Sequence, residues 1–490
     1  MSASARIARF DPFAGPPRIN GARRVGIRPG TELIHPIAVT GERPLRFELV
    51  GLPDGIAVDE DGILRGHAPD SAGEHEVRVE VSNARGSASA TVTICVGPLL
   101  GLTPPMGWNS WNVYGEKVSA EVIIRMAEAM VANGMRDLGY QYVNIDDFWH
   151  AKSRNADGTP AANPETFPGG IAPVADALHR LGLKLGIYSD AAHLTCGKCF
   201  GGLGYEQIDA RSYAEWGVDL LKYDYCHAPK DRQTAVDRYG AMSRALQATD
   251  RSILLSACEW GGRQPWLWAE GLGATTWRTT LDIFDTFTWL YFGVRGIARK
   301  NLTLADHAGP GAWNDPDMLL VGNRGRGNVT SRLPVGPKGT LKLPLRGLND
   351  AQALSHMTLW VMMAAPLLAS HDLASGSALD NAILTNPDVL AVNQDVLGRQ
   401  GRKVPSARGI WQIRKPLADG GAAVSLTNVG PVARTVEVDP VEGLGTPPVG
   451  GWKVIDAWSG EVLTGTGPRK VRLDRHESVL YVARPAPRSQ

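Results

Sequence analysis

Three apolar segments of the sequence each end on an aspartate. They cover residues 139–146, 182–190 and 217–224, and each follows a segment with helical periodicity. Continuous apolar strands with helices between them are typical of a parallel sheet that is covered on both faces. In a β/α barrel, the loops after the strands carry the active site. The three carboxylates are therefore expected at one rim, although a single aspartate of this kind is more often a helix cap.

Acidic residues recur at the expected strand ends, and many stand near tryptophan. Carboxylates bind sugar hydroxyls and aromatic faces stack on C–H surfaces, so this combination suits a sugar site. Retaining cleavage of a glycoside needs two carboxyl groups roughly 5 Å apart, one as nucleophile and the other as acid and then base. The candidate acids are Asp146, Asp147, Asp190, Asp224, Glu259, Asp282, Asp315 and Asp317.

The alternative interpretation of clustered acids is a divalent metal site. Lys222 and Arg278 lie among these acids and would repel a cation. Lys222 precedes Asp224 by two residues, so on a strand it shares that face and its charge favours the ionised carboxylate. The sequence therefore predicts a sugar site with neither metal nor cofactor.

The pattern of apolar residues divides the chain into three folded parts, which follow a tail at residues 1–15. Residues 99–395 alternate between helices and strands, which predicts an α/β fold with a (β/α)8 barrel. One of its helices should begin after Ser119, the expected N-cap, and end at Asn133-Gly134. Residues 16–98 and 396–490 alternate with period 2, which predicts a β-sandwich on either side of the barrel.

Composition excludes several classes of partner. The 51 basic and 50 acidic residues leave a formal net charge of +1, whereas proteins that bind nucleic acids or anionic membranes usually present a basic surface. The sequence contains no run of about 18 apolar residues, the length that a membrane-spanning helix needs. The N-terminus lacks the apolar stretch of a signal peptide, which predicts a cytoplasmic location; a periplasmic or secreted protein would have lost a leader. The sequence does not define an oligomeric state.

The five cysteines do not form a disulfide scaffold, because their number is odd and the chain is long. Cys95 falls on the outward phase of its strand, which predicts a free or partly covered thiol. Cys196-Gly-Lys-Cys199 is a lone C-x-x-C, and no second pair or histidine cluster in the sequence completes a zinc site.

Five motifs, in order along the chain from about residue 102 onwards, resemble glycoside hydrolase family 27, the α-galactosidase and melibiase family. The motifs are Pro104-Pro-Met-Gly-Trp-Asn-Ser-Trp111, Asn144-Ile-Asp-Asp-Phe-Trp149, Leu221-Lys-Tyr-Asp-Tyr-Cys226, Trp277-Arg-Thr-Thr-Leu-Asp-Ile283 and Trp313-Asn-Asp-Pro-Asp-Met318.

The resemblance implies a retaining mechanism, with Asp224 as nucleophile and Asp282 as acid/base, and it singles Asp282 out from the other acids. Arg278 lies four residues before Asp282, near enough to anchor a hydroxyl or a carboxylate. Asp282 must stay protonated to act as an acid, which requires burial or a nearby negative charge such as that of Asp224.

The resemblance also implies the sugar contacts and a disulfide between Cys196 and Cys226. In this pocket Trp108 packs against the sugar, Asp146 and Asp147 hold the 4- and 6-hydroxyls of galactose, and the remaining contacts come from Tyr188, Lys222, Glu259 and Arg278.

The expected activity is exo-hydrolysis of terminal α-linked galactose from oligosaccharides or glycoconjugates. Within the family, the intact Asp146–Asp147 pair favours a hexose over the pentose of β-L-arabinopyranosidases. Glu259 occupies a position where the family's α-N-acetylgalactosaminidases carry smaller residues to make room for the acetamide, which favours unmodified galactose. The alternatives are a relative with another glycone, namely a β-L-arabinopyranosidase or an isomaltodextranase, and a carbohydrate-binding protein without catalysis. Intact Asp224 and Asp282 argue against the last of these.

Three features depart from the commoner architecture of the family. Residues 16–98 resemble the immunoglobulin-like modules that precede some bacterial members, and we expect them to support the barrel. Lys198 and Cys199 are additional residues in their loop. Residues 322–347 are rich in Gly, Pro and basic residues, which predicts a long loop, either at the barrel rim beside the substrate or as a surface insertion.

Overall fold

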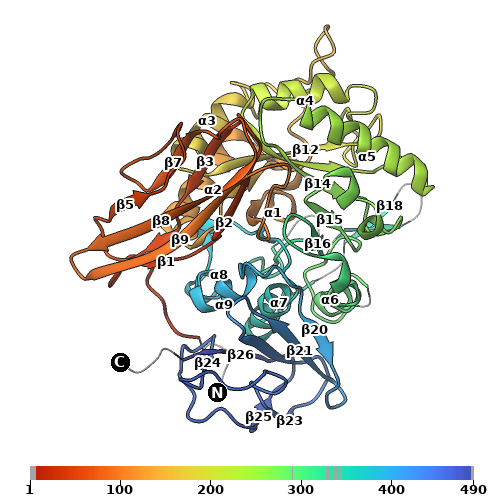
Figure 1. Ribbon diagram of the computed structural model, residues 1–490. Helices are drawn as coiled ribbons and strands as arrows, with labels where there is room; N and C mark the ends of the chain where they lie inside the picture. Colours follow the sequence, from red (N-terminus) through yellow and green to blue (C-terminus); the bar gives the residue numbers. More distant parts are fainter. Residues whose placement is uncertain (1–6, 290, 327–331, 336–338, 343–344, 487–490) are drawn as a thin grey trace.

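The computed structural model describes residues 7–289, 291–326, 332–335, 339–342 and 345–486. In Figure 1 the chain forms a central β/α barrel with β-sheets from the N-terminal part on one side and from the C-terminal part below. The order of these three parts is the expected one, while the residue boundaries between them stay predictions.

The barrel is a parallel sheet of eight strands that follow one another in sequence order. An isolated parallel bridge between Leu319 and Ala369 joins the chain beyond the seventh strand to the eighth, so the sheet curls into a ring. The strands are β10 (Met106–Asn109), β11 (Tyr142–Asn144), β12 (Lys184–Asp190), β13 (Val218–Asp224), β14 (Leu254–Cys258), β15 (Thr276–Arg278), β16 (Trp313–Asp315) and β19 (Leu367–Ala369).

Helices surround this sheet, and α2 buries one apolar face of Ile123, Met126, Ala127 and Met130. In α2 the Ser119 hydroxyl accepts a hydrogen bond from the amide of Val122 at 3.3 Å, and the helix gives way at Asn133 to Gly134, whose φ is 81°. Both expected ends are thus confirmed. The helices are α1 (Trp111–Tyr114), α2 (Ala120–Ala132), α3 (Ala172–Arg180), α4 (Glu206–Glu215), α5 (Arg232–Gln247), α6 (Val294–Asn301), α7 (Asp350–Met362), α8 (Ala378–Leu384) and α9 (Pro387–Asn393).

Helix α7 joins the barrel to the C-terminal sheets. Its N-terminus carries a capping box between Asn349 and Gln352, and every residue from Ala353 to Met362 is buried. This stretch of α7 is therefore covered on all sides, including its polar residues Ser355, His356 and Thr358. The Nε1 of Trp458 in the C-terminal part donates to the hydroxyl of Thr358 at 3.1 Å.

The C-terminal part is an antiparallel β-sandwich. Its larger sheet has the strand order β20-β21-β22-β26-β24, and β23 pairs with β25. The bounds are β20 (Arg402–Val404), β21 (Ile410–Pro416), β22 (Ala422–Asn428), β23 (Arg434–Val438), β24 (Trp452–Asp456), β25 (Arg469–Leu473) and β26 (Ser478–Pro485).

The N-terminal part contains two main sheets over their own apolar core. One has the order β2-β9-β8-β5, the other β3-β7-β6, and β1 pairs with β4. Cys95 is a half-buried free thiol, as expected. An immunoglobulin-like identity stays a prediction. The strands are β1 (Arg18–Ile19), β2 (Arg24–Ile27), β3 (Glu32–Pro36), β4 (Val39–Thr40), β5 (Arg46–Val50), β6 (Ile56–Val58), β7 (Ile63–His67), β8 (Gly73–Asn83) and β9 (Gly86–Val96).

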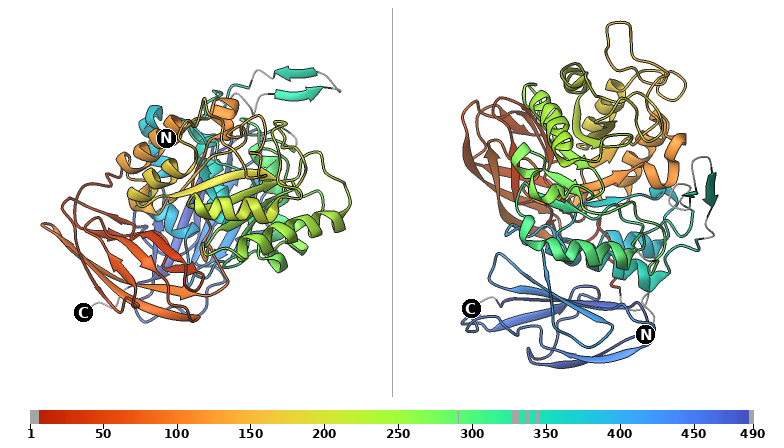
Figure 2. Two further views of the ribbon diagram at one scale, coloured as in Figure 1. Left: turned by 90° about the horizontal axis from the view of Figure 1, so that it is seen from above. Right: turned by 90° about the vertical axis from the view of Figure 1, so that its right-hand side faces the viewer.

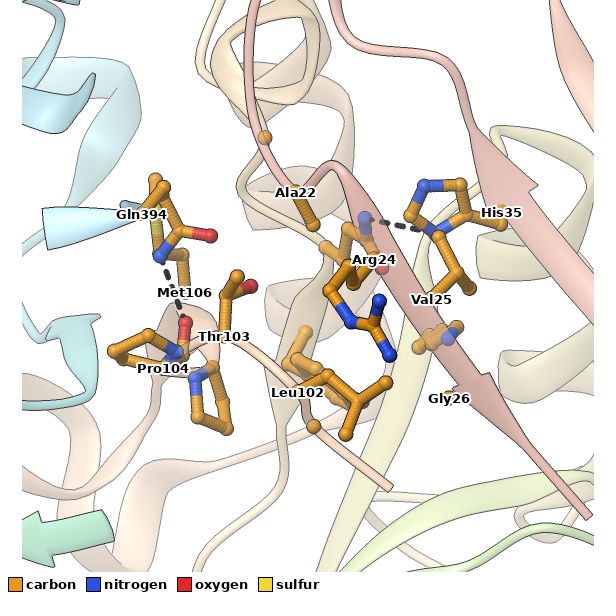
Figure 3. A pocket seen from close by; sticks show the side chains of 16 residues that line it. Ala22, Arg24, Val25, Gly26, His35, Leu102, Thr103, Pro104, Met106 and Gln394 are labelled. Atoms are coloured by element: carbon orange, nitrogen blue, oxygen red, sulfur yellow. Dashed lines mark hydrogen bonds between the residues drawn. The ribbon is translucent and has the colours of Figure 1, made fainter. Parts of the chain in front are cut away.

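These N-terminal sheets contact the barrel where its strands begin. A cavity of about 50 Å³ lies at this junction. Figure 3 shows His35 and Arg24 on one side of it and Thr103 and Pro104 on the other. The Nδ1 of His35 lies 3.2 Å from Nε2 of Gln141, just before β11. The N-terminal part therefore covers the amino end of the barrel and leaves the opposite rim free of it.

The structure differs from expectation in two segments, the predicted tail at residues 1–15 and the predicted loop at residues 322–347. Ile7 is buried in the main core and the amide of Ala8 donates to Trp458 O at 2.9 Å, so the described part of the predicted tail packs against the molecule. The predicted loop at residues 322–347 contains an antiparallel hairpin of β17 (Arg332–Val335) and β18 (Gly339–Lys342), which projects from the barrel in Figure 2. The rest of this prediction falls partly on residues 327–331, 336–338 and 343–344, outside the described residues.

Among the described residues, no helix combines the length and the apolar composition needed to cross a membrane.

Candidate active site

Asp224 is the last residue of β13 and is 4% exposed at the carboxyl end of the barrel. Its Oδ2 accepts a hydrogen bond from the hydroxyl of Tyr188 at 2.9 Å, and its Oδ1 accepts one from the amide of Tyr225 at 2.9 Å. Tyr188 comes from the neighbouring strand β12. Two donors thus fix the carboxylate in one orientation.

The electrostatics of Asp224 are dominated by burial. Burial raises the pKa of its carboxyl to about 7, and the charge of Asp282 adds to this, while Lys222 and Tyr188 act to lower it. The expected influence of Lys222 is present but weaker than desolvation. Asp190 pairs with Asp224 across β12 and β13, and burial followed by the Asp224 charge raises the pKa of Asp190 to about 9. Asp190 therefore stays protonated at neutral pH.

Asp146 and Asp147 follow β11 and are both buried. Asp146 Oδ2 accepts from Lys222 Nζ at 2.8 Å and from Asn109 Nδ2 at 2.9 Å. Asp147 accepts from the amides of Gly197 at 2.7 Å and of Phe148 at 2.8 Å. The ammonium of Lys222 thus bonds directly to Asp146 and acts on Asp224 through space.

Arg278 at the end of β15 binds two carboxylates. Its Nη2 lies 3.0 Å from Oδ1 of Asp282 and 3.1 Å from Oδ2 of Asp317. The arginine is buried, whereas the side chain of Asp282 is 57% exposed. Arg278 thus anchors a carboxylate, as expected. Of the two conditions expected to keep Asp282 protonated, burial is not present in this structure, whereas the charge of Asp224 lies close enough to interact with it.

Glu259 lies directly after β14 and is fully buried. Its Oε2 accepts from the amide of Arg263 at 2.7 Å and from Nη1 of the same residue at 3.0 Å. Its Oε1 has no hydrogen-bond partner among the described residues. Glu259 is therefore held at the rim with one oxygen uncommitted, and no hydrogen bond or ion pair joins it to Asp224 or Asp282.

Trp108 and Trp111 differ in exposure. Trp108 is fully buried within the core, and its Nε1 donates to His371 O at 2.7 Å. Its contact with a sugar stays a prediction. Trp111, which the sequence analysis did not select, is half-buried and stacks on Phe148, with ring centroids 6.1 Å apart and an interplanar angle of 6°. Only its position within the first motif pointed to it.

The disulfide between Cys196 and Cys226 is confirmed. It joins the loops that follow β12 and β13, and Cys196 Sγ lies 3.9 Å from Oδ2 of Asp224. The amide of Cys226 donates to Asp190 at 2.9 Å. This crosslink therefore holds the backbone on both sides of Asp224.

The predicted acids meet at one rim because the parallel strands all end there. Beneath them, a cavity of about 30 Å³ inside the barrel is lined by Lys222, Arg278, Asp315 and Asp317 from three different strands or their ends. Buried carboxylates alternate here with fixed cations and hydroxyl donors. A polyhydroxylated ligand matches this arrangement, and a β/α barrel with such a carboxylate rim has the design of a glycoside hydrolase.

Comparison with known proteins agrees with this class. Residues 103–333 and 340–395 match the family model described as alpha galactosidase A, and residues 383–483 match the alpha galactosidase C-terminal beta sandwich domain. The chain belongs to the α-galactosidase (melibiase) family, glycoside hydrolase family 27.

Individual relatives match about two thirds of this chain or more. An alpha-galactosidase of Cyamopsis tetragonoloba is 41% identical over 67% of this chain and 73% of its own. Human alpha-galactosidase A is 36% identical over 69% of this chain and 78% of its own. The crystal structure of a candidate alpha-galactosidase/melibiase from Bacteroides fragilis superposes with a TM-score of 0.90 at 42% identity, covering 97% of this chain and 99% of that one.

Proposed function

We propose that this protein removes terminal α-linked galactose from oligosaccharides or glycoconjugates by double displacement, with Asp224 as nucleophile and Asp282 as acid/base. The retaining mechanism is typical of the family. The observation that carries the assignment of roles is the environment of Asp224, a buried carboxylate fixed by Tyr188 and Tyr225 and close enough to Asp282 for their charges to interact.

In the first step an Asp224 oxygen attacks the anomeric carbon as the glycosidic C–O bond breaks. Asp282 gives its proton to the departing oxygen. In the second step Asp282 takes a proton from water, whose oxygen displaces Asp224 and releases galactose with its original configuration. Asp282 exchanges protons with bulk water easily because its side chain is 57% exposed.

The sugar itself supplies the burial that Asp282 lacks in this structure. A galactose in the pocket would exclude water from the Asp282 carboxyl. Arg278 shares its guanidinium between Asp282 and Asp317, so it can hold Asp282 in place after the proton has left.

The remaining contacts follow from the same geometry. Asp146 and Asp147 would accept hydrogen bonds from the 4- and 6-hydroxyls, since backbone amides and Lys222 already fix both carboxylates. Tyr188, Lys222, Glu259 and Arg278 complete the pocket. Because Trp111 exposes part of its ring, it is better placed than the buried Trp108 to cover the sugar.

Product stereochemistry with azide tests the two roles separately. Asp224→Ala should lose at least about 1000-fold in kcat and, with azide, convert an aryl α-galactoside into β-galactosyl azide, because the small anion enters from the vacated side. Asp282→Ala should instead give α-galactosyl azide through the galactosyl-enzyme. If Asp224→Ala gave the α-azide and Asp282→Ala the β-azide, the two roles would be reversed. Wild-type turnover in Asp224→Ala would exclude Asp224 as the nucleophile.

The glycone is tested by hydrolysis of aryl α-galactoside, β-L-arabinopyranoside and α-glucoside at equal concentration. We expect the galactoside to be cleaved fastest, because Asp147 has a hydroxymethyl group to bind only in a hexose. Faster cleavage of either other substrate would favour the relatives with another glycone. Binding without turnover of any of the three would favour a carbohydrate-binding protein.

A further inference from the structure

A second cluster of side chains lies on the outer side of Asp147. One ligand atom each of Asp147, His150 and Cys199 falls within 4.8 Å of the others. Nδ1 of His150 is 3.7 Å from Oδ1 of Asp147. Asp147 and His150 follow β11 and Cys199 follows β12, so two adjacent strands bring together residues that are far apart in the sequence. The histidine that the C-x-x-C motif lacks in the sequence is supplied by the fold.

His150 is the unusual member of this cluster. Its side chain is 0% exposed, and neither ring nitrogen has a hydrogen-bond partner among the described residues. Burying an unpartnered polar group costs free energy, so each such group calls for an explanation. The ring stacks on Trp149 at 4.1 Å and meets the edge of Phe200 at 4.8 Å, which fixes its plane. A buried imidazole without hydrogen-bond partners can offer a ring nitrogen to a metal ion.

Cys199 faces this histidine with a free thiol, because the other cysteine of the motif is bonded to Cys226. The backbone of Cys199 is held by Thr195, whose hydroxyl accepts from its amide at 3.0 Å and whose amide donates to its carbonyl at 2.9 Å. The side chain is half-buried, which gives an ion access from solvent.

The charges suit a divalent cation. As zinc ligands, a carboxylate, a thiolate and a neutral imidazole would together carry two negative charges, the thiolate forming when the metal ion displaces the thiol proton. Arg154 acts electrostatically on His150, but its guanidinium binds both oxygens of Asp209, at 2.5 and 2.8 Å, and is thereby neutralised. A donor set of S, N and O selects zinc over calcium or magnesium, which prefer oxygen alone.

We propose that Asp147, His150 and Cys199 form a binding site for Zn²⁺, with three protein ligands and a fourth position left for solvent. Bound zinc takes Asp147 away from the substrate and so inhibits hydrolysis. This second statement rests on the proposed function, in which Asp147 holds the sugar, whereas the binding of the ion does not.

Calorimetric titration of the full chain with zinc chloride tests the site directly. The protein is stripped with EDTA and kept free of reductant, which preserves the disulfide. Wild type should bind one ion, and Cys199→Ser should weaken binding at least tenfold. The matched control is Cys95→Ser, which replaces the other half-buried free thiol and should bind as wild type does.

Cobalt substitution identifies the ligands. Co²⁺ added to wild type should give a thiolate-to-metal charge-transfer band in the near ultraviolet, and Cys199→Ser should lack it. His150→Gln should also bind zinc more weakly, with thermal unfolding as the check on folding. Absence of binding to wild type, unchanged affinity in Cys199→Ser, or an equal loss in Cys95→Ser would each overturn the site.

Kinetics then separate the two statements. Zinc should inhibit hydrolysis of an aryl α-galactoside competitively in wild type, and Cys199→Ser, with normal turnover in EDTA, should resist it. Zinc that binds in calorimetry without competing with substrate would overturn the role of Asp147 in sugar binding and leave the metal site standing.

Discussion

Burial of the Asp224 carboxylate should make the free energy of unfolding depend on pH. Because its pKa is raised to about 7 in the folded chain, the folded state retains a proton that the unfolded state releases above about pH 4. Stability due to this group is therefore lost as the pH rises from about 4 to about 7. Asp190 has a raised pKa for the same reason and titrates together with Asp224.

We predict that Asp224→Asn is more stable than wild type at pH 8, by a few kcal/mol at most, and that this advantage disappears near pH 4. The amide removes the penalty for burying a charged carboxylate. Thermal unfolding of both proteins at the two pH values measures the effect. An advantage of the variant that is independent of pH would contradict the raised pKa.

A second prediction at this scale concerns the two tryptophans of the first motif. Trp111→Ala should raise KM or lower kcat/KM about tenfold or more while leaving the unfolding temperature nearly unchanged, because its ring is only half-buried. Trp108→Ala should instead reduce stability by about 3 to 5 kcal/mol, since it removes a fully buried aromatic ring. Kinetics and denaturant unfolding of the pair decide, and a purely structural loss in Trp111→Ala would exclude it from the sugar site.

The sequence pattern located single residues well when strand geometry alone placed them. Asp224 and Asp190 end apolar strands, and parallel strands all end at the same rim. The pattern did not reveal partners that come from separate strands. Nothing in the sequence links Arg278 to Asp317, 39 residues later, or His150 to Cys199. Nor could it show that burial outweighs Lys222 at Asp224, because desolvation depends on the whole surrounding core.

At the scale of elements, the C-terminus of α5 is capped from another part of the molecule. The guanidinium of Arg28 donates to the carbonyls of Gln247 and Thr249 at 2.7 Å each, with further bonds to those of Leu246 and Arg251. Carbonyls at the end of a helix have no partner within it, so an arginine from the N-terminal sheets satisfies them.

We predict that Arg28→Ala lowers the free energy of unfolding by about 2 kcal/mol, because several charge-assisted hydrogen bonds are lost together. The kinetic constants should not change, since α5 is capped at the amino end of the barrel. Arg78→Ala is the control, as that side chain is 72% exposed and forms an ion pair with Glu80 at 4.0 Å. Equal stability of the two variants would show that the cap contributes nothing.

The Cys196–Cys226 disulfide joins two elements that carry the site. It closes a loop with a sequence separation of 30 residues, and the chain-entropy estimate for such a loop is about 3.5 kcal/mol. The double variant Cys196→Ser/Cys226→Ser should lose stability of this order. It should also raise KM, because the amide of Gly197 then positions Asp147 less firmly. A variant with unchanged KM would limit the crosslink to a stabilising role.

Considered as a whole, the molecule has its N-terminal sheets bound to the barrel through buried polar contacts. Arg251 bridges Glu32 at 2.8 Å and Asp219 at 2.7 Å, and Ile63 packs against Gly182 just before β12. The order of the three parts could be predicted because the hydrophobic period changes between them. Their docking could not, because it depends on single residues from distant segments.

This docking predicts cooperative unfolding of the N-terminal sheets with the barrel. Calorimetry of the intact chain should give no separate early transition for residues 16–98, because their loss would remove Glu32 from Arg251 and uncover the contact of Ile63 with Gly182. Two resolved unfolding transitions, with enzymatic activity retained after the first, would show instead that the N-terminal part unfolds independently of the barrel.

The N-terminal sheets cover the amino end of the barrel, and the reacting carboxylates lie at its other end. A solid support coupled through the outer strand β5 would therefore lie on the side of the molecule away from the active site. Val50, 71% exposed on that strand, is a suitable position for a unique coupling handle. Molecules immobilised in this way would all present their pockets outward, so even bulky glycans on a cell or a polymer could reach them without crossing the support.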